Sequence, residues 1–277
     1  MEALRKIWQT WGREMLKFCV WAIMSVLVCF LLYQVLVNRT TQHLIPLSAG
    51  ERDSLMTVVL PSGMTDTLLN NEAFDVHFNA GQGIANCVAY ELTMEELHGD
   101  VPRFDFMCDT GVKGCPLPTD YAGSGLERGH LVPAGDLKWS ENAMRQSFLM
   151  TNICPMSKSL NEGGWAKLEE KVREWVRRDS ALLVFAGPVV NKNDSTIAEG
   201  RVTVPSHYFK VVMAPCVRPV RAIAFIYPNG NSGGRLNKYA VSVDDVEKRT
   251  GLDFFPFLPV DEQHRMESTV NLEAWLN

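Results

Sequence analysis

The sequence lacks an excess of positive charge. Its 27 Lys and Arg residues are outnumbered by 32 Asp and Glu residues, and the formal net charge of the 277 residues is −5. This balance argues against a protein that coats nucleic acid through a strongly basic overall field. Cysteine is sparse as well, since seven residues are too few for a small scaffold held by disulfides.

Other class signatures are also missing. No GxGxxG, phosphate-binding P-loop or GxSxG pattern occurs, so the nucleotide-cofactor and serine-hydrolase classes have no support. With 46% hydrophobic and 21% charged residues, and no repeat or low-complexity tract, the chain is not disordered, collagen-like or a coiled coil.

Long uncharged stretches are absent except for residues 18–37, FCVWAIMSVLVCFLLYQVLV. A helix of this length spans roughly 30 Å, the thickness of a bilayer core. A cleaved signal peptide has a shorter apolar region, of about 7–15 residues, followed by a small-x-small site, which is not found here. We therefore expect an uncleaved transmembrane signal anchor rather than a signal peptide or a buried helix.

The flanking charges predict how this anchor is oriented. The residues before it are basic on balance, so the positive-inside rule places residues 1–17 in the cytoplasm. Residues 38–70 are polar and turn-rich and are expected to be a linker to a domain of residues 71–277. Because the N-terminus does not resemble an Arg/Ser-rich transit peptide, we expect a single-pass protein of a bacterial inner membrane, with this domain in the periplasm.

An oxidising compartment permits disulfides. Cys108 and Cys115 flank the loop CDTGVKGC and are the pair most easily bridged, while any pairing among Cys87, Cys154 and Cys216 stays open.

Short apolar runs rich in β-branched residues predict strands at 87–93, 148–155, 181–190, 207–214 and 221–228. An apolar stripe with spacings of three and four predicts a long helix over 161–178, with Asn161 able to cap its start. Shorter helices are expected after Ser140 and over 244–251. Because strands and helices do not alternate regularly, we expect an α+β fold with a mixed sheet.

Four consecutive residues, Glu127, Arg128, Gly129 and His130, combine a flexible backbone, a phosphate-shaped guanidinium and a general base. Alone, such a string is as compatible with a structural histidine. Further polar residues follow His130 at intervals of 22, 31, 39 and 43 positions, namely Asn152, Asn161, Glu169 and Arg173.

This ordered set resembles the DNA/RNA non-specific endonuclease family, which includes endonuclease G and Serratia nuclease-like enzymes. The family signature is DRGH, an Asn on the next strand and LNxxxWxxLE on a helix. The chain has ERGHLVPAGD, then MTNICPMSKSLNEGGWAKLE, then REW. Further likeness in 185–190, 204–212 and 239–256 extends the resemblance over about residues 71–260. One departure is Glu127, where the family has Asp.

The resemblance implies a ββα-metal active site and a role for each residue. His130 would be the general base, and Asn161 the sole direct protein ligand of Mg²⁺, with Mn²⁺ as an alternative. Glu169 would hold a metal-bound water, and Arg128 and Arg173 would contact phosphate. Asn152 would orient water, His130 or phosphate. Glu127 and Gly129 would support the site. The plain alternatives are a helix cap, solvated helix charges and a turn asparagine.

We therefore expect a metal-dependent endonuclease that cuts DNA and RNA with little sequence preference and contacts the lipid bilayer through residues 18–37. The region 128–178 carries nine basic and six acidic residues, so the expected site is locally positive in an acidic chain. The alternatives are a degenerate member that only binds nucleic acid or a phosphorylated polymer, and a phosphodiesterase acting on a smaller ester. The resemblance also implies a homodimer.

Overall fold

The computed structural model describes Trp11, Met15, residues 21–30 and residues 47–276. The chain divides into two compact units, residues 1–44 and 45–277. In the first unit residues 21–30 are helical. Within the described residues, no helix has both the length and the apolar character needed to cross a membrane. The expected anchor, 18–37, extends past both ends of this described stretch, so the anchor and the cytoplasmic segment before it stay predictions.

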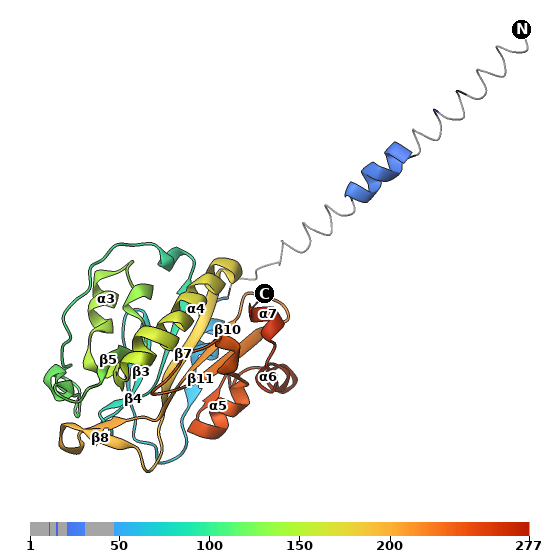
Figure 1. Cartoon of the computed structure of the whole chain (residues 1–277). Coiled ribbons are helices and arrows are strands. Elements are labelled where there is room, and N and C mark those ends of the chain that lie inside the picture. The colour runs from blue at the N-terminus through green and yellow to red at the C-terminus, as the bar shows by residue number, and fades with distance from the viewer. Residues whose placement is uncertain (1–10, 12–14, 16–20, 31–46, 277) are drawn as a thin grey trace, which may run out of the picture. The chain divides into compact units, whose positions relative to one another are not determined.

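The second unit is built on a seven-stranded sheet with the order β12-β11-β10-β7-β4-β3-β2 (Figure 1). Its strands are β2 (Thr67–Asn70), β3 (Phe74–Asn79), β4 (Ile84–Thr93), β7 (Ala181–Val189), β10 (His207–Ala214), β11 (Arg221–Pro228) and β12 (Ala240–Val241). Four of the predicted strands are the neighbouring strands β4, β7, β10 and β11. Their near-continuous apolar sequences reflect burial on both faces, as in β7, where every residue is buried.

Every pair in this sheet is antiparallel. The α+β class is confirmed, whereas the expectation of a mixed sheet is wrong. The apolar runs predict strands but do not encode the direction in which neighbours pair, because both faces are covered in either arrangement.

A second, smaller strand pair carries the motif region. Strand β5 (Glu127–His130) pairs antiparallel with β6 (Ile153–Met156), opposing Glu127 to Met156 and His130 to Ile153. The chain then enters a π-helical turn, η5 (Leu160–Trp165), which continues into α4 (Ala166–Asp179). Strand β6 begins later than predicted and includes Pro155, because residues 150–152 form a 3-10 turn. The result is the expected ββα arrangement.

Two hydrophobic clusters pack on opposite faces of the sheet. The first includes the apolar stripe of α4 and Trp275 of α7 (Leu272–Leu276), together with residues of β6 and the two residues directly after β5, Leu131 and Val132. The second includes buried residues of α5 (Val243–Thr250) and α6 (Val260–Glu267). Figure 1 shows α5 and α6 as neighbours, away from α3 (Glu141–Ser147) and β5. The ββα motif and the pair α5/α6 are therefore separated by the sheet.

Residues 47–70 belong to the folded unit, so the predicted linker of 38–70 is too long. They form α2 (Ala49–Met56), β1 (Val58–Val59) paired with β13 (Asp253–Phe254), and the edge strand β2. Ser48 and Glu51 make a capping box at the start of α2. This Ser-x-x-Glu pattern is a helix-start signature that could have shortened the linker from sequence alone.

The predicted helices after Ser140 and over 244–251 are confirmed as α3 and α5. Ser140 caps α3 through the Ala143 N–H, and Gly251 ends α5 in the left-handed conformation that glycine favours. The remaining elements are β8 (Ser195–Ile197), β9 (Val202–Val204) and the 3-10 turns η1 (Glu95–Leu97), η2 (Pro118–Tyr121), η3 (Ala134–Asp136), η4 (Met150–Asn152), η6 (Ala198–Gly200) and η7 (Leu236–Lys238).

Candidate active site

The ββα motif places most of the predicted residues around one cavity of about 450 Å³. Strand β5 contributes Arg128 and His130, the π-helical turn contributes Asn161, and α4 contributes Glu169 and Arg173. These five residues are spread over 46 positions of the sequence but line the same cavity. The structure thus brings them together, and it adds Arg103 from the loop between η1 and η2.

His130 is held inside an aromatic enclosure. Its side chain is almost buried, with its ring centroid 4.8 Å from that of Phe148 and 5.4 Å from that of Phe106. No hydrogen bond to another described residue engages the ring, and Nε2 is buried without a partner. Burial, aided by the positive charge of Arg103, lowers the pKa of His130 to about 3. The imidazole is therefore neutral at physiological pH, the form that can accept a proton.

The backbone of His130 is fixed from two sides. The Trp165 Nε1–H donates to the His130 carbonyl over 3.1 Å, which makes this buried tryptophan a core anchor that also positions the motif. Gly129 lies directly against β6, where a Cβ atom would collide with the side chain of Met156. The supporting role predicted for Gly129 therefore has a steric basis, because a side chain at this position would have to displace that of Met156.

Asn161 is paired with Glu127. Its Nδ2 donates a hydrogen bond of 2.8 Å to Glu127 Oε2. This orientation leaves Oδ1, which accepts no hydrogen bond from any described residue. A neutral amide oxygen next to a carboxylate suits Mg²⁺, a hard cation that keeps several of its waters and needs few protein ligands. The residues present thus fit the metal that the resemblance implies.

Asn161 does not cap the helix, contrary to the sequence-based expectation. The helical backbone already starts at Lys158, and the Ser157 hydroxyl accepts the N–H of Leu160. Because the cap is provided by Ser157, the side chain of Asn161 is available for the cavity.

Asn152 does not line the cavity, and its side chain makes no hydrogen bond to His130. The side chain is fully buried, and all of its hydrogen bonds are to main-chain groups. Oδ1 accepts from the Val132 N–H at 2.9 Å, while Nδ2 donates to the carbonyls of Val132 and Ser147 at 3.0 and 2.9 Å. Asn152 is thus a positioning residue that clamps the segment directly after His130.

Arg173 and Glu169 belong to a half-buried charge cluster at the wall of the cavity. Arg173 binds Asp136 through Nη1 at 2.7 Å and also contacts Glu170, so Glu169 is not its direct partner. Burial raises the pKa of Glu169 to about 7, although the nearby Lys210 ammonium opposes this shift. Asp136 is fully buried and accepts a further hydrogen bond from the Tyr90 hydroxyl at 3.1 Å.

Comparison with known proteins shows the family to which the chain belongs. Residues 51–261 match the model of a family described as DNA/RNA non-specific endonuclease. The chain belongs to this family.

Several relatives of the chain are nucleases by name. It is 33% identical over 201 residues to "Nuclease EXOG, mitochondrial" of Mus musculus, a match covering 65% of this chain and 55% of that protein. It is 32% identical over 217 residues to "Nuclease C1" of Cunninghamella echinulata var. echinulata, covering 72% and 86%. The chain thus spans about half the length of the mitochondrial EXOG nuclease, but most of Nuclease C1.

The fold of this family member is also found among solved structures. A chain in the crystal structure of the EndoG/EndoGI complex superposes with a TM-score of 0.67, covering 71% of this chain and 89% of that one. At 22% identity, this likeness shows the fold alone.

Three residues in or near the site, Lys210, Asp136 and Arg103, are not predicted from the sequence. Lys210 on β10 is fully buried, with Nζ 4.5 Å from the ring centroid of Trp165 and 3.5 Å from the Leu131 carbonyl. A single lysine inside the apolar run HYFKVVMA is the pattern that could have revealed it. Asp136 follows the motif directly and could have been singled out, whereas nothing in the sequence distinguishes Arg103.

Cys108 and Cys115, the pair most easily bridged, are both free thiols in the structure. Cys115 Sγ accepts from the Asp109 N–H at 3.2 Å, while Cys108 Sγ donates to the Cys115 carbonyl at 3.5 Å. The two side chains also interact with each other, and their pairing in an oxidising compartment stays a prediction.

Proposed function

We propose that this family member is a metal-dependent endonuclease that hydrolyses phosphodiester bonds of DNA and RNA with little sequence specificity. The observation that carries the proposal is the placement of an unpaired neutral imidazole, His130, in the same cavity as the free amide oxygen of Asn161. A general base and a cation ligand in one cavity are the two components that phosphodiester hydrolysis needs.

His130 acts as the general base in this mechanism. Its neutral ring takes a proton from a water molecule, whose oxygen forms a bond to phosphorus as the bond to the leaving oxygen breaks. Asn161 would hold the divalent cation, which when bound would supply positive charge for the phosphate and the leaving oxygen. Glu127 holds the Asn161 amide in the orientation that directs Oδ1 to this cation. The leaving oxygen takes up a proton from solvent, which balances the reaction.

The arginines bind the phosphate backbone. Arg103 and Arg128 line the catalytic cavity and a second cavity of about 580 Å³, which Glu127 and Asn161 also line. The two cavities therefore form one groove with the guanidinium groups at their junction. Contacts of this kind fix the sugar–phosphate chain and carry no base information, which explains a low sequence preference and allows both DNA and RNA.

The experiment offers the purified full chain three substrates: supercoiled plasmid, a structured RNA and a small phosphodiester. We expect plasmid and RNA to be cut when Mg²⁺ is present and to survive when the metal is chelated, with Mn²⁺ as a substitute. A retarded but intact plasmid would instead indicate a degenerate binding protein. Turnover of the small ester alone would indicate a phosphodiesterase of a different substrate class.

The predicted location of the protein is a separate proposal. We propose that residues 18–37 anchor the chain in a bacterial inner membrane with the nuclease domain in the periplasm. The support is the length and apolar character of this segment and the basic residues that precede it. Protease added to spheroplasts should then degrade the nuclease domain, whereas protection until lysis would contradict the orientation. Light scattering of the purified chain tests the homodimer that the family resemblance implies.

A further inference from the structure

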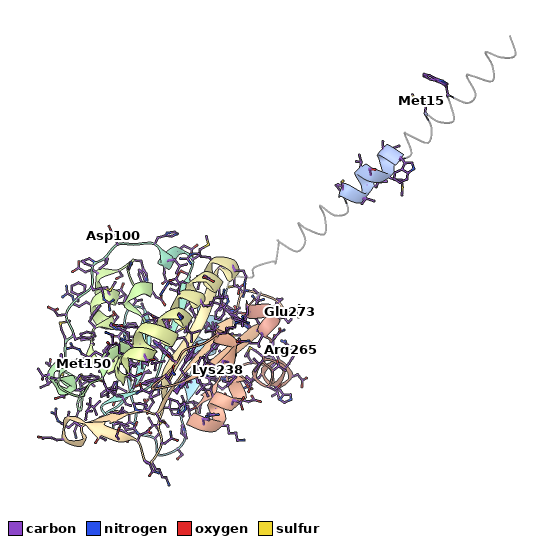
Figure 2. All side chains as sticks on the ribbon, viewed as in Figure 1. Met15, Asp100, Met150, Lys238, Arg265 and Glu273 are labelled. Carbon is purple, nitrogen blue, oxygen red and sulfur yellow. The ribbon has the colours of Figure 1, made fainter. Side chains whose placement is uncertain are left out.

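Three carboxylates gather on the face of the sheet opposite the catalytic cavity. Asp244 and Glu247 lie one turn apart on α5, and Glu267 lies at the end of α6. One oxygen atom from each of them falls within 4.8 Å of the other two. Figure 2 labels Arg265, which marks the helix that carries Glu267. Helices α5 and α6 pack in the second hydrophobic cluster, whereas Leu131 and Val132, which follow His130, pack in the first.

The buried member of this triad has one carboxylate oxygen without a hydrogen-bond partner. Glu267 is only 5% exposed, and its Oε1 makes no hydrogen bond within the described part of the protein. The Gln263 side chain interacts with the Glu267 carboxylate and lowers its pKa, and its amide donates to the Phe254 carbonyl at 3.3 Å. An unsatisfied polar atom at such a depth is uncommon in native proteins and indicates an unseen ligand.

Nothing in the described residues neutralises the triad. None of its carboxylates forms an ion pair there, although Arg265 on the same helix pairs with Glu262 at 3.8 Å. Burial and the charge of Glu247 raise the pKa of Glu267 to about 8, and burial raises that of Glu247 to about 7. Both shifts are caused first by burial, and neighbouring acidic groups add to them.

We propose that Asp244, Glu247 and Glu267 bind a structural divalent cation, for which Ca²⁺ is the best fit. Ca²⁺ binds six to eight oxygens at 2.3–2.6 Å, so its ligand atoms lie no more than about 5 Å apart, a spacing that the triad already provides. Mg²⁺ usually retains its waters and uses one or two protein carboxylates, and the softer metals prefer nitrogen or sulfur.

The bound ion would join three elements. Glu247 Oε1 accepts the Phe254 N–H of β13 at 2.7 Å, so this carboxylate is already tied to the strand that pairs with β1. A cation shared with Glu267 adds α6 to the connection. The site would therefore stabilise the C-terminal part of the domain, and its occupancy would not be required for the chemistry at His130.

The test measures the melting temperature of the chelator-treated full chain, in mild detergent, as Ca²⁺ or Mg²⁺ is added. The background is Asn161→Ala, so that binding at the active site cannot contribute. We expect saturating Ca²⁺ to raise the melting temperature by roughly 5 °C, with a smaller effect of Mg²⁺. In this background, Glu267→Gln should abolish the rise, and so should Asp244→Asn, which changes an exposed residue and disturbs the fold less. The control Glu262→Gln, on the same helix as Glu267, should keep the rise.

The proposal is overturned if millimolar Ca²⁺ leaves the melting temperature of the Asn161→Ala chain unchanged. It is equally overturned if the rise persists in both Glu267→Gln and Asp244→Asn.

Discussion

The Glu127 carboxylate and the Asn161 amide are joined by a hydrogen bond of 2.8 Å that runs from β5 to the π-helical turn before α4. The family has Asp at the position of Glu127, and the additional methylene does not prevent this contact. The π-helical turn inserts an extra residue into the helix and is the setting in which Asn161 faces the cavity. The replacement is therefore compatible with an intact metal site.

Removing this contact should weaken metal binding. In Glu127→Ala the Asn161 amide can rotate and present its nitrogen to the cavity, so we expect the Mg²⁺ concentration for half-maximal plasmid cleavage to rise about 10- to 100-fold. Glu127→Gln retains an acceptor oxygen at the same distance and should show a smaller rise. An unchanged Mg²⁺ requirement in Glu127→Ala would contradict the positioning role.

Asn152 should matter for stability more than for chemistry. Asn152→Ala removes three buried hydrogen bonds and leaves main-chain groups unpaired, so we expect a loss of roughly 2–4 kcal/mol in the free energy of unfolding. Urea denaturation measures this loss. At a low temperature, where the variant is folded, its kcat should lie within about tenfold of that of the parent chain. A much larger fall in kcat with unaltered unfolding would show that Asn152 touches the reacting groups.

His130 should remain uncharged well below the pH at which an ordinary histidine titrates. With a pKa of about 3 in the folded state against 6.5 in the unfolded chain, the unfolded state binds more protons between these values, and stability falls as the pH drops from 6.5. An NMR titration, assigned with His130→Gln, should show no protonation of His130 down to pH 5. Titration near 6.5 would contradict the buried, unpaired imidazole.

Lys210 should stabilise the domain by an amount that depends on pH. Lys210→Met removes the cation beside Glu169, so the pKa of Glu169 should rise further above about 7. A pKa raised in the folded state reduces stability as the pH increases through it. The destabilisation should therefore grow between pH 5 and pH 8 in urea titrations, and added Glu169→Gln should relieve most of it. A pH-independent loss would indicate a packing defect instead.

Site residues that belong to a spaced motif are predictable from the sequence. Site residues whose contacts are buried are much less so. Spacing in the sequence is enough to predict that His130, Asn161 and Glu169 lie near one another, and they line one cavity. The hydrogen bonds of Asn152 are not predictable in this way, because its partners are main-chain groups up to 20 residues away. Lys210 was overlooked because its burial below Trp165 depends on the pairing of β10 with its neighbours, which local patterns do not encode.

Supercoiled plasmid cleavage by the full chain, compared with His130→Ala under the same Mg²⁺ concentration, tests the central claim most directly. Circular dichroism on both proteins first establishes that the variant is folded. With His130 as the general base, the parent chain should nick and linearise the plasmid, and the variant should do so about 10²- to 10⁴-fold more slowly. Equal rates for the two proteins, or an intact plasmid with the folded parent chain, would contradict it.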